Sequence, residues 1–437
     1  MINKVSVIGL GKLGSPIVAT LAERGFTTHG VDVNEHYVTC INKGEAPVEE
    51  PLLDEMLKKN KHLIHASMDV ENAVFSTDAT MIIVPTPSEE SGEFSTAFVK
   101  EALKPIARAI AKKDDFHVIV LTSTVLPGAS ESEIIPLLEN LTGKKCGIDF
   151  GYCYNPEFIA LGNVIKNLLN PDFILIGESD QKSGELLEEF YKRYCENNPP
   201  IKRMKIVNAE ITKISINTFV TTKISFANSI TQLCDIIPGG NVDEVTSAVG
   251  LDTRIGLKYL KGGVGYGGPC FPRDNRALAR VYENFNLEHS IAKATDQINQ
   301  NHADFIVNKI TQLIPEGGNV AILGLSYKPY TPVIEESQNI TVAKKLVLKG
   351  YSVTAYDPLG IENAKNILND INYTYSINEC VKDKDVICLM TLWDEFTKLE
   401  PEDLPTNEKK PYLIDCWRVL DKAKFSSKVN LIQLGVN

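Results

Sequence analysis

KVSVIGLGKLG, residues 4–14, opens the chain with a short apolar strand that runs directly into a glycine-rich turn. The glycines of this turn have the spacing G-x-G-x-x-G and are Gly9, Gly11 and Gly14. Residues 15–25 then repeat apolar side chains at helical spacing, and a second strand at 27–33 carries Asp32 near its end. This order of strand, glycine turn, helix, strand and acid predicts a Rossmann unit.

Such a turn has the features needed to hold a dinucleotide. Its glycines allow a pyrophosphate to approach the helix N-terminus closely, at the position where Leu13 also lies. Asp32 is placed to accept hydrogen bonds from ribose hydroxyls, and its charge would repel a 2′-phosphate. The sequence therefore predicts NAD rather than NADP as the cofactor, with a Rossmann turn that binds no nucleotide as the alternative.

The composition limits the other functions that the chain can have. Its 437 residues exceed one ordinary core, so we expect two or three domains. The net charge of −11 argues against a broad surface for nucleic acid or for an anionic membrane. Apolar runs are too short for a membrane span, and the N-terminus does not resemble a signal peptide. Nine cysteines without metal-type spacing favour reduced thiols in the cytoplasm and no metal site.

Strands and helices continue to alternate, which predicts an α/β doubly wound sheet. Four further apolar runs of strand length end in turn residues, at 77–88, 115–128, 149–158 and 171–179. Ligands of such sheets bind at the carboxyl ends of the strands. We therefore expect the segments 84–88, 122–128 and 154–158 to meet near the reactive end of the cofactor, with Pro85, Thr86 and Thr124 as contacts.

The second half of the chain differs in texture. Residues 209–237 show helical spacing without proline and predict one long helix, with Lys213 and Asn217 four apart on one face. For Lys213 a solvated surface lysine is the alternative. A second alternating unit begins after residue 315, and Asp357 ends one of its strands as Asp32 ends its own. The predicted domains are 1–200, 201–302 and 303–437.

Between these units lies GGVGYGGPCFPRDNRAL, residues 262–278, in which five glycines surround Cys270. Arg273 and Asp274 follow directly behind the cysteine. A core cysteine needs no such loop, whereas a reacting thiol does, because the glycines let the backbone wrap closely around a substrate. We interpret Cys270 as a nucleophile and most of the other eight cysteines as core residues.

Together these motifs resemble the UDP-glucose/GDP-mannose dehydrogenase family over essentially the whole chain. They occur in the order VIGLGKLG, VPTP, STVLPG, NPEF, AE-TK-S-N-F, GGPCFPRD, GLSYKP-T and YDP. The resemblance implies an NAD-binding Rossmann domain, a central helical dimerisation domain with one long helix, and a C-terminal Rossmann-like nucleotide-sugar domain. It also implies oxidation of the C6 alcohol of a nucleotide sugar to a carboxylate, with two NAD per turnover, and a homodimer.

The resemblance assigns roles in that chemistry. Cys270 would form a thiohemiacetal with the aldehyde and then a thioester, while Lys213 and Asn217 would stabilise the oxyanion. Asp274 would accept a proton or hold a water, Thr124 would position water, and Glu157 would be the base for hydrolysis. The alternative for Glu157 is an acid that starts a helix after Pro156.

It also implies contacts with the nucleotide sugar. Lys328 matches a contact with the nucleotide phosphates, and Arg254 matches an arginine that reaches the substrate of the neighbouring subunit. For Lys258 and Lys261, beside the loop, a solvated face is as good an interpretation as a contact. The expected substrate contacts are Phe158, Lys213, Asn217, Arg254, Tyr259, Gly267, Phe271, Lys328 and Arg418.

Several positions depart from the family pattern. Leu161 and Glu335 stand where many members carry other polar or charged residues, and the late D-G-R is here DCWR, which leaves Arg418 as the local arginine. These departures leave open which sugar and base are used: UDP-glucose is favoured, with a UDP-N-acetylhexosamine or GDP-mannose as alternatives. A two-electron hydroxyacid dehydrogenase and a non-catalytic NAD-sensing protein are alternatives of other classes.

The assignment of Asp32 generates a prediction. We expect catalytic efficiency with NAD to exceed that with NADP by at least about tenfold, equivalent to about 1.4 kcal/mol. Steady-state kinetics with both cofactors measure this ratio. Equal use of the two cofactors would remove Asp32 from the ribose site.

Overall fold

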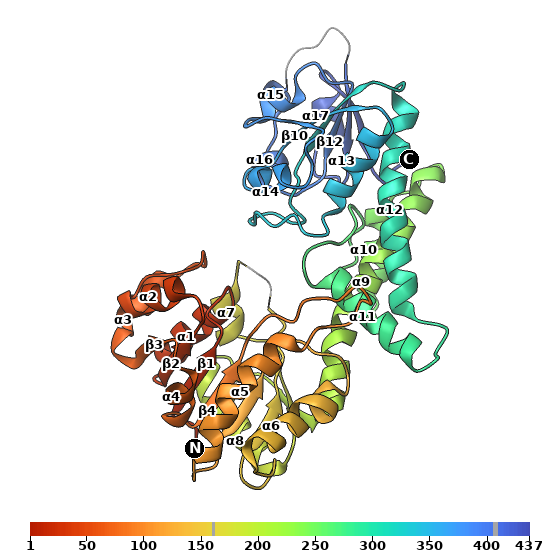
Figure 1. Ribbon diagram of the computed structural model, residues 1–437. Helices are drawn as coiled ribbons and strands as arrows, with labels where there is room; N and C mark the ends of the chain where they lie inside the picture. Colours follow the sequence, from red (N-terminus) through yellow and green to blue (C-terminus); the bar gives the residue numbers. More distant parts are fainter. Residues whose placement is uncertain (160–161, 405–409) are drawn as a thin grey trace. The chain divides into compact units, whose positions relative to one another are not determined.

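The computed structural model describes residues 1–159, 162–404 and 410–437, and it comprises two compact units, 1–215 and 216–437. Each unit contains one sheet packed against helices (Figure 1). The helical segment after residue 215 belongs to the same unit as the second sheet. The division into three domains stays a prediction, and the helix Ile291–Leu313 runs without a break through its expected boundary at 302–303.

The first unit holds an eight-stranded sheet in the order β3-β2-β1-β4-β5-β6-β7-β8. All its pairings are parallel except that of β7 with β6. The strands are β1 Lys4–Ile8, β2 Thr27–Val31, β3 Ile64–Ser67, β4 Ala79–Ile82, β5 Val118–Leu121, β6 Gly151–Tyr154, β7 Ile174–Glu178 and β8 Ile201–Lys205. The helices are α1 Gly14–Glu23, α2 Glu35–Lys43, α3 Leu53–Lys59, α4 Val70–Phe75, α5 Ala97–Lys112, α6 Ile135–Thr142, α7 Val164–Leu169 and α8 Gln181–Tyr194.

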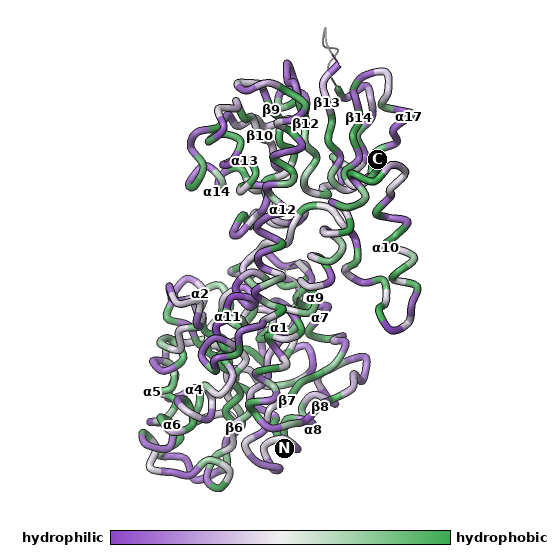
Figure 2. Tube along the Cα trace, turned by 90° about the vertical axis from the view of Figure 1, so that its right-hand side faces the viewer, coloured by the Kyte–Doolittle hydropathy of each residue, from purple (hydrophilic) through white to green (hydrophobic). Residues whose placement is uncertain are grey.

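Both faces of this sheet are buried. Along β5, Val118 and Val120 belong to one apolar cluster, whereas Ile119 and Leu121 belong to another. Successive side chains of a strand point to opposite faces, so the two clusters lie on the two sides of the sheet. The helices that cover them alternate between hydrophilic and hydrophobic residues along the chain (Figure 2).

The predicted glycine turn joins β1 to α1. Gly9 has φ +101°, and a Cβ there would lie 2.3 Å from the carbonyl oxygen of Ile83. A Cβ on Gly14 would lie 1.7 Å from the carbonyl oxygen of Gly9. Both positions therefore exclude any side chain, because strand, turn and helix backbones touch there.

The second unit holds a six-stranded sheet in the order β11-β10-β9-β12-β13-β14, with every pairing parallel among the residues that the structure describes. The strands are β9 Asn319–Leu323, β10 Ser352–Tyr356, β11 Asn372–Tyr373, β12 Val386–Leu389, β13 Tyr412–Asp415 and β14 Asn430–Gln433. The helices between them are α13 Gln338–Leu348, α14 Ile361–Lys365, α15 Ile377–Val381, α16 Asp394–Thr397 and α17 Lys422–Phe425. This is the predicted second Rossmann-like unit.

The predicted long helix is confirmed as α9, Ile206–Ile236, which begins in the first unit and continues into the second. In the second unit it packs with the helices α10 Val242–Leu251, α11 Phe271–Asn284 and α12 Ile291–Leu313 (Figure 1). Thr221 bonds Asn275 of α11, and Thr222 bonds Thr295 of α12. These side-chain hydrogen bonds join α9 to α11 and to α12.

The two sheets use the aspartate after their second strand differently. Asp32 is half-buried and accepts from the backbone N–H groups of Leu10 and Asn34, at 2.6 and 2.8 Å. Asp357 is buried and accepts from six donor groups: the N–H groups of Leu325, Ser326, Leu359 and Gly360, the Ser326 hydroxyl and the indole of Trp393. Only Asp32 keeps access to a ligand.

This difference predicts different effects on stability. Asp357→Ala leaves several buried N–H groups unpaired, so we expect it to lower the free energy of unfolding of the second unit by about 3 kcal/mol or more. Urea unfolding followed by tryptophan fluorescence measures this, because both tryptophans, Trp393 and Trp417, lie in that unit. Asp32→Ala is the control and should leave this transition in place; equal shifts for both variants would contradict the prediction.

Candidate active site

The turn after β1 is open on the side where a dinucleotide would bind. A Cβ on Gly11 would meet no atom within 4 Å, unlike one on Gly9 or Gly14. No side chain caps the N-terminus of α1 at Leu13 among the described residues. Uncapped N–H groups and a glycine facing open space are what a pyrophosphate requires. The residues present therefore fit NAD, with Asp32 beside the turn for a ribose.

The carboxyl ends of β4 and β5 meet as predicted. The Ser123 hydroxyl donates to the carbonyl of Val84 at 2.7 Å, and the Thr86 hydroxyl donates to the carbonyl of Thr124 at 2.8 Å. Thr86 and Thr124 are buried, whereas Pro85 between these contacts is exposed. This edge of the sheet thus holds two of the predicted cofactor contacts beside each other.

Lys213 lies against the segment that follows β6. Its buried ammonium group donates to the backbone carbonyl of Glu157 and lies 4.8 Å from the ring centre of Phe158. The carboxylate of Glu157 accepts from the backbone N–H of Ile159 at 2.6 Å. Lys213 is therefore not the solvated surface lysine of the alternative interpretation, and three of the predicted site residues are neighbours in the first unit.

Glu210 is a residue of this region that sequence reasoning missed. Glu210, one turn before Lys213 on α9, accepts from the backbone N–H groups of Gly128 and Ser130 at 2.6 and 3.0 Å. Burial raises the pKa of Glu210, and the hydrogen bonds from Ser130 and Gly128 lower it. Its carboxylate thus ties α9 to the 122–128 segment that carries Thr124. Its signal in the sequence was an acid one turn before Lys213, on the helical face that also carries Asn217.

In the second unit, Cys270 is the one exposed cysteine among the described cysteines; Cys146 is half-buried and the others are buried. It stands at the N-terminus of the 14-residue helix α11, and its carbonyl accepts from the N–H of Asp274 at 2.8 Å. A helix N-terminus favours the thiolate form of a cysteine. Burial raises the pKa of Tyr327 to about 12 and lowers that of Lys328, and the charge of Cys270 raises both.

Asp274 and Asn217 form a pair beside this thiol. The Asn217 amide donates to the Asp274 carboxylate at 2.6 Å, and the carboxylate is almost completely buried. The guanidinium of Arg273 lies 3.4 Å from the other carboxylate oxygen. The predicted catalytic amide and carboxylate are therefore in direct contact in the second unit.

Packing within the protein accounts for several glycines of the cysteine loop. A Cβ on Gly267 would lie 2.4 Å from the carbonyl oxygen of Glu336, and one on Gly268 would lie 2.6 Å from the ring of Tyr327. The N–H of Gly268 donates to the carbonyl of Glu335 at 3.0 Å. A role of the loop glycines in wrapping the backbone around a substrate stays a prediction, and these two glycines are in addition required by the packing of the fold itself.

The remaining predicted substrate contacts have diverse surroundings. Arg254 is exposed and bonds Asp252 at 2.6 Å. Tyr259 is exposed with φ +64°, and the half-buried Phe271 packs edge-on against Tyr266. Leu161 lies outside the described residues.

Arg418 is buried and fully engaged within the chain. Its guanidinium bonds both oxygens of Asp243, at 2.8 and 2.9 Å. It also donates to the carbonyls of Cys416, Leu434 and Gly262. Its hydrogen bonds thus join α10, the start of the cysteine loop and the end of the chain to the segment after β13.

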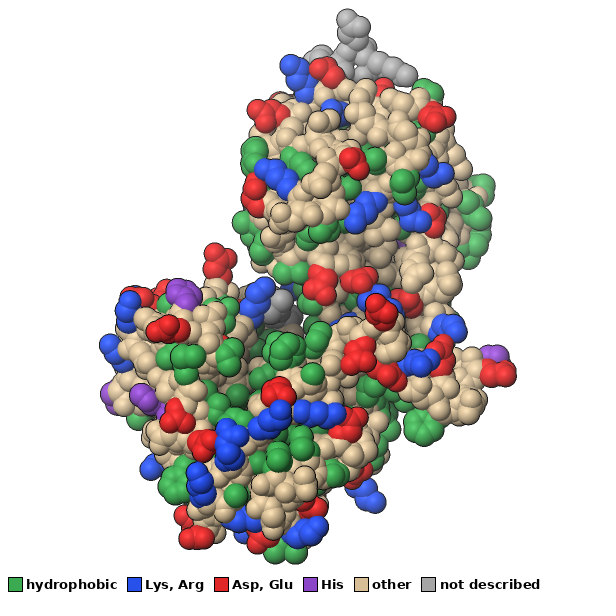
Figure 3. Space-filling model, in the orientation of Figure 1, with side chains coloured by type: hydrophobic (Ala, Val, Ile, Leu, Met, Phe, Trp, Pro, Cys, Tyr) green, Lys and Arg blue, Asp and Glu red, His purple; other side chains and the backbone are tan. Residues whose placement is uncertain are grey.

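Two surface features lie apart from these residues. Figure 3 shows basic side chains in a row across the first unit, where α5 carries Lys100, Lys104, Arg108 and Lys112; each pairs with Glu133, Glu101 or Glu71.

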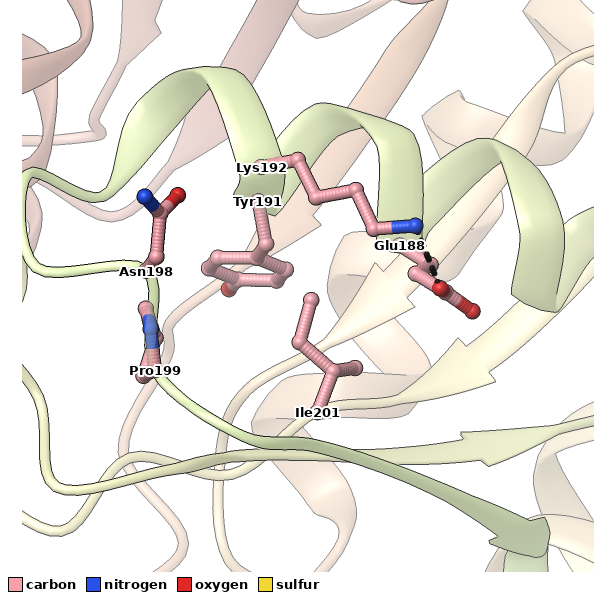
Figure 4. Close-up of a pocket in the computed structure, with 6 residues that line it drawn as sticks. All are labelled: Glu188, Tyr191, Lys192, Asn198, Pro199 and Ile201. Carbon is pink, nitrogen blue, oxygen red and sulfur yellow. Dashed lines mark hydrogen bonds and ion pairs between the residues drawn. The ribbon is translucent and has the colours of Figure 1, made fainter.

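A hollow of about 430 Å³ lies between α8 and β8 (Figure 4). Its lining contains the Lys192–Glu188 ion pair and none of the predicted site residues. Within the described ranges, no helix has the length and apolarity to cross a membrane.

Comparison with known proteins gives consistent matches along the chain. Three models of the UDP-glucose/GDP-mannose dehydrogenase family match: its NAD binding domain at residues 3–195, its central domain at 207–301 and its UDP binding domain at 321–422. UDP-glucose 6-dehydrogenase AglM of Haloferax volcanii is 33% identical over 403 residues, which cover 91% of this chain and 93% of the relative. GDP-mannose 6-dehydrogenase of Pseudomonas aeruginosa is 33% identical over 358 residues, 81% of each chain.

Solved structures agree with this result. A UDP-glucose dehydrogenase from Pyrobaculum islandicum superimposes with a TM-score of 0.89 at 30% identity and covers 100% of this chain and 98% of its own. The glycine turn, the thiol at the start of α11 and the two Rossmann-like sheets therefore have one explanation: the chain belongs to the UDP-glucose/GDP-mannose dehydrogenase family and is an oxidoreductase with an NAD-binding domain.

Proposed function

We propose that this protein oxidises the C6 alcohol of a UDP-sugar to the carboxylate through a thioester on Cys270. UDP-glucose is the substrate that we favour. The observation that carries this proposal is the exposed Cys270 thiol at the N-terminus of α11, one turn before Asp274, whose buried carboxylate accepts from the Asn217 amide. An alcohol dehydrogenase that stops at the carbonyl needs no such nucleophile. Oxidation to an acid does, because an aldehyde releases a second hydride only after a nucleophile has added to it.

Bound NAD would supply the chemistry of hydride acceptance, once for the alcohol and once for the thiohemiacetal. The Cys270 thiolate adds to the aldehyde carbon, forming a C–S bond and an oxyanion that takes a proton to give the thiohemiacetal. Loss of hydride and of that proton leaves the thioester. Water then attacks the thioester carbon, the C–S bond breaks, and the carboxylate and the thiol are released.

The other predicted site residues have roles that follow from these steps. The ammonium of Lys213 and the amide of Asn217 are donors for the oxyanion that forms at each addition. Asp274 orients the Asn217 amide and accepts a proton. Glu157 is the base that activates water for hydrolysis, and Thr124 helps to position that water.

The nucleotide belongs to the second unit in this proposal. Its 321–422 segment matches a UDP binding domain, and the half-buried Lys328 provides a cation near Cys270 for the diphosphate. The curated relatives described above are a UDP-glucose 6-dehydrogenase and a GDP-mannose 6-dehydrogenase, which is why UDP-glucose leads and GDP-mannose and UDP-N-acetylhexosamines follow. Nine cysteines without a disulfide among the described residues suit a cytoplasmic enzyme.

A second copy of the chain is the partner that we propose. In the second unit, α9 exposes Phe219, Phe226 and Leu233 at intervals of seven residues, a spacing that suits helix-to-helix packing. Leu251 and Leu257, on either side of Arg254, are also exposed apolar residues. A dimer would cover both surfaces and place Arg254 toward the substrate of the other subunit.

The thioester mechanism predicts different failures for two variants. Cys270→Ser should abolish steady acid production, because an alkoxide forms less readily than a thiolate. Glu157→Gln should complete both oxidations once and then stall, because hydrolysis lacks its base. Rapid mixing with NAD and UDP-glucose should show a burst of up to two NADH per active site, and intact mass should show the sugar nucleotide attached at Cys270.

The same experiment separates the alternatives. A hydroxyacid dehydrogenase would release one NADH per substrate and an NAD sensor none. Normal turnover of Glu157→Gln would make this carboxylate structural, in line with its bond to Ile159, and would leave Thr124 and Asp274 to manage water.

The proposed dimer is tested by Phe226→Glu, which puts a charge at the centre of the exposed row on α9. We expect the mass measured by light scattering to fall to that of one chain and activity to fall with it. Leu348→Glu, at a more exposed apolar residue on α13, is the matched control and should change neither. An unchanged mass for Phe226→Glu would place the interface elsewhere.

A further inference from the structure

The cysteine loop, residues 262–268, is mostly buried within the second unit. Its backbone N–H and carbonyl groups therefore need hydrogen-bond partners inside the protein. Asn299 of α12 supplies two of them to one residue. Its side-chain oxygen accepts from the N–H of Tyr266 at 2.9 Å, and its amide donates to the carbonyl of Tyr266, also at 2.9 Å. This two-point contact defines both the position and the orientation of that peptide.

His302, one turn further along α12, holds the start of the loop. Its Nε2 lies 2.6 Å from the carbonyl oxygen of Gly263, and its Nδ1 lies 3.1 Å from the amide nitrogen of Gln232 on α9. The Gln232 amide donates to Nδ1, so the ring proton resides on Nε2 and points at Gly263. Burial lowers the pKa of His302 to about 4, which keeps this ring neutral near neutral pH.

Two further elements complete the contacts. Asn228 of α9 accepts from the N–H of Gly263 at 2.9 Å, and Arg418 donates to the carbonyl of Gly262 at 2.6 Å. The indole of Trp417 packs so closely on Gly263 that a Cβ there would lie 2.5 Å from the ring. Trp417 and Arg418 belong to the DCWR stretch that departs from the family pattern.

We propose that Asn228, Asn299, His302 and Arg418 form a loop clamp, a set of positioning residues that hold residues 262–266 so that Cys270 is presented at the N-terminus of α11. The proposal rests on the proposed function, because it assigns these residues to the reaction of the Cys270 thiol. It assigns Arg418 to the loop rather than to the substrate.

The order of the chain explains how the clamp acts on the thiol. Only three residues separate Tyr266 from Cys270, and the Gly268 N–H is bonded to the carbonyl of Glu335. A shift of the clamped peptides therefore passes to the thiol without a flexible spacer. Misplacement of a reacting group by about 1 Å costs on the order of a hundredfold in rate.

The test removes one contact and then restores it. His302→Leu lacks the donor to Gly263, and we expect kcat to fall about tenfold or more while KM for NAD stays unchanged. Alkylation of Cys270 by iodoacetamide at pH 7 should slow about threefold or more, because the thiol leaves its place at the helix N-terminus. His302→Gln retains a donor and should recover most of both rates.

Thr295→Val is the matched control. Thr295 is a buried polar residue of the same helix, one turn before Asn299, and its hydroxyl bonds Thr222 rather than the loop. It should lose stability without changing alkylation. Peptide mass spectrometry assigns the alkylated cysteine, and Cys270→Ser gives the background from the other thiols.

If His302→Leu does not fold, Asn299→Asp decides, since it keeps the shape but turns an acceptor toward the carbonyl of Tyr266. Slowed alkylation in a folded variant supports the clamp, and wild-type alkylation with wild-type kcat in either variant overturns it. An equal loss in Thr295→Val would also overturn it, because the effect would then follow stability alone. Full activity of Cys270→Ser would refute the proposed function while leaving the alkylation result to judge the clamp.

Discussion

A buried irregular backbone must find hydrogen-bond partners, and this constraint shapes the second unit around its cysteine loop. A helix pairs its backbone N–H and carbonyl groups with one another, whereas residues 262–268 form no helix or strand and cannot pair theirs in this regular way. Buried side chains of α9 and α12 provide the partners instead, among them Asn228, Asn299 and His302. The long helices therefore both bury apolar surface and hold the loop that ends in Cys270.

The same constraint explains a difference between the two sheets, whose first six strands follow the same order. Gly9 and Gly324 have nearly the same φ, +101° and +102°, and their N–H groups both donate at 2.8 Å to the last residue of the neighbouring strand. The aspartates that follow those strands are used in different ways. In the first unit Asp32 keeps access to a ligand. In the second unit the carboxylate of Asp357 instead accepts hydrogen bonds from the backbone of the turn and from the indole of Trp393. Both units contain a Rossmann-like sheet, but only the first has a turn with an aspartate that is accessible to a dinucleotide.

Much of the fold was predictable because it depends on local repetition. Short apolar runs of strand length with flanking turn residues predicted β4, β5, β6, β7, β9, β10, β12 and β13, and unbroken helical spacing predicted α9. The short edge strands β3 and β11 have weaker patterns and were not predicted. The antiparallel pairing of β7 was also outside the prediction, because strand direction depends on the path of the chain and not on side-chain period.

The sequence by itself determined the family and the motifs from which its chemistry is predicted: the glycine turn with Asp32, the glycine-rich loop with Cys270, and the spacing of Lys213 and Asn217 on one helix. Each of these signals lies within a few residues, where spacing alone constrains geometry. The tertiary structure decided which distant groups meet. It brings Glu210 to Gly128, His302 to Gly263 and Arg418 to Asp243, pairs separated by tens to hundreds of residues. No local pattern marks such partners, because they are selected by the buried polar groups that the folded backbone leaves unpaired.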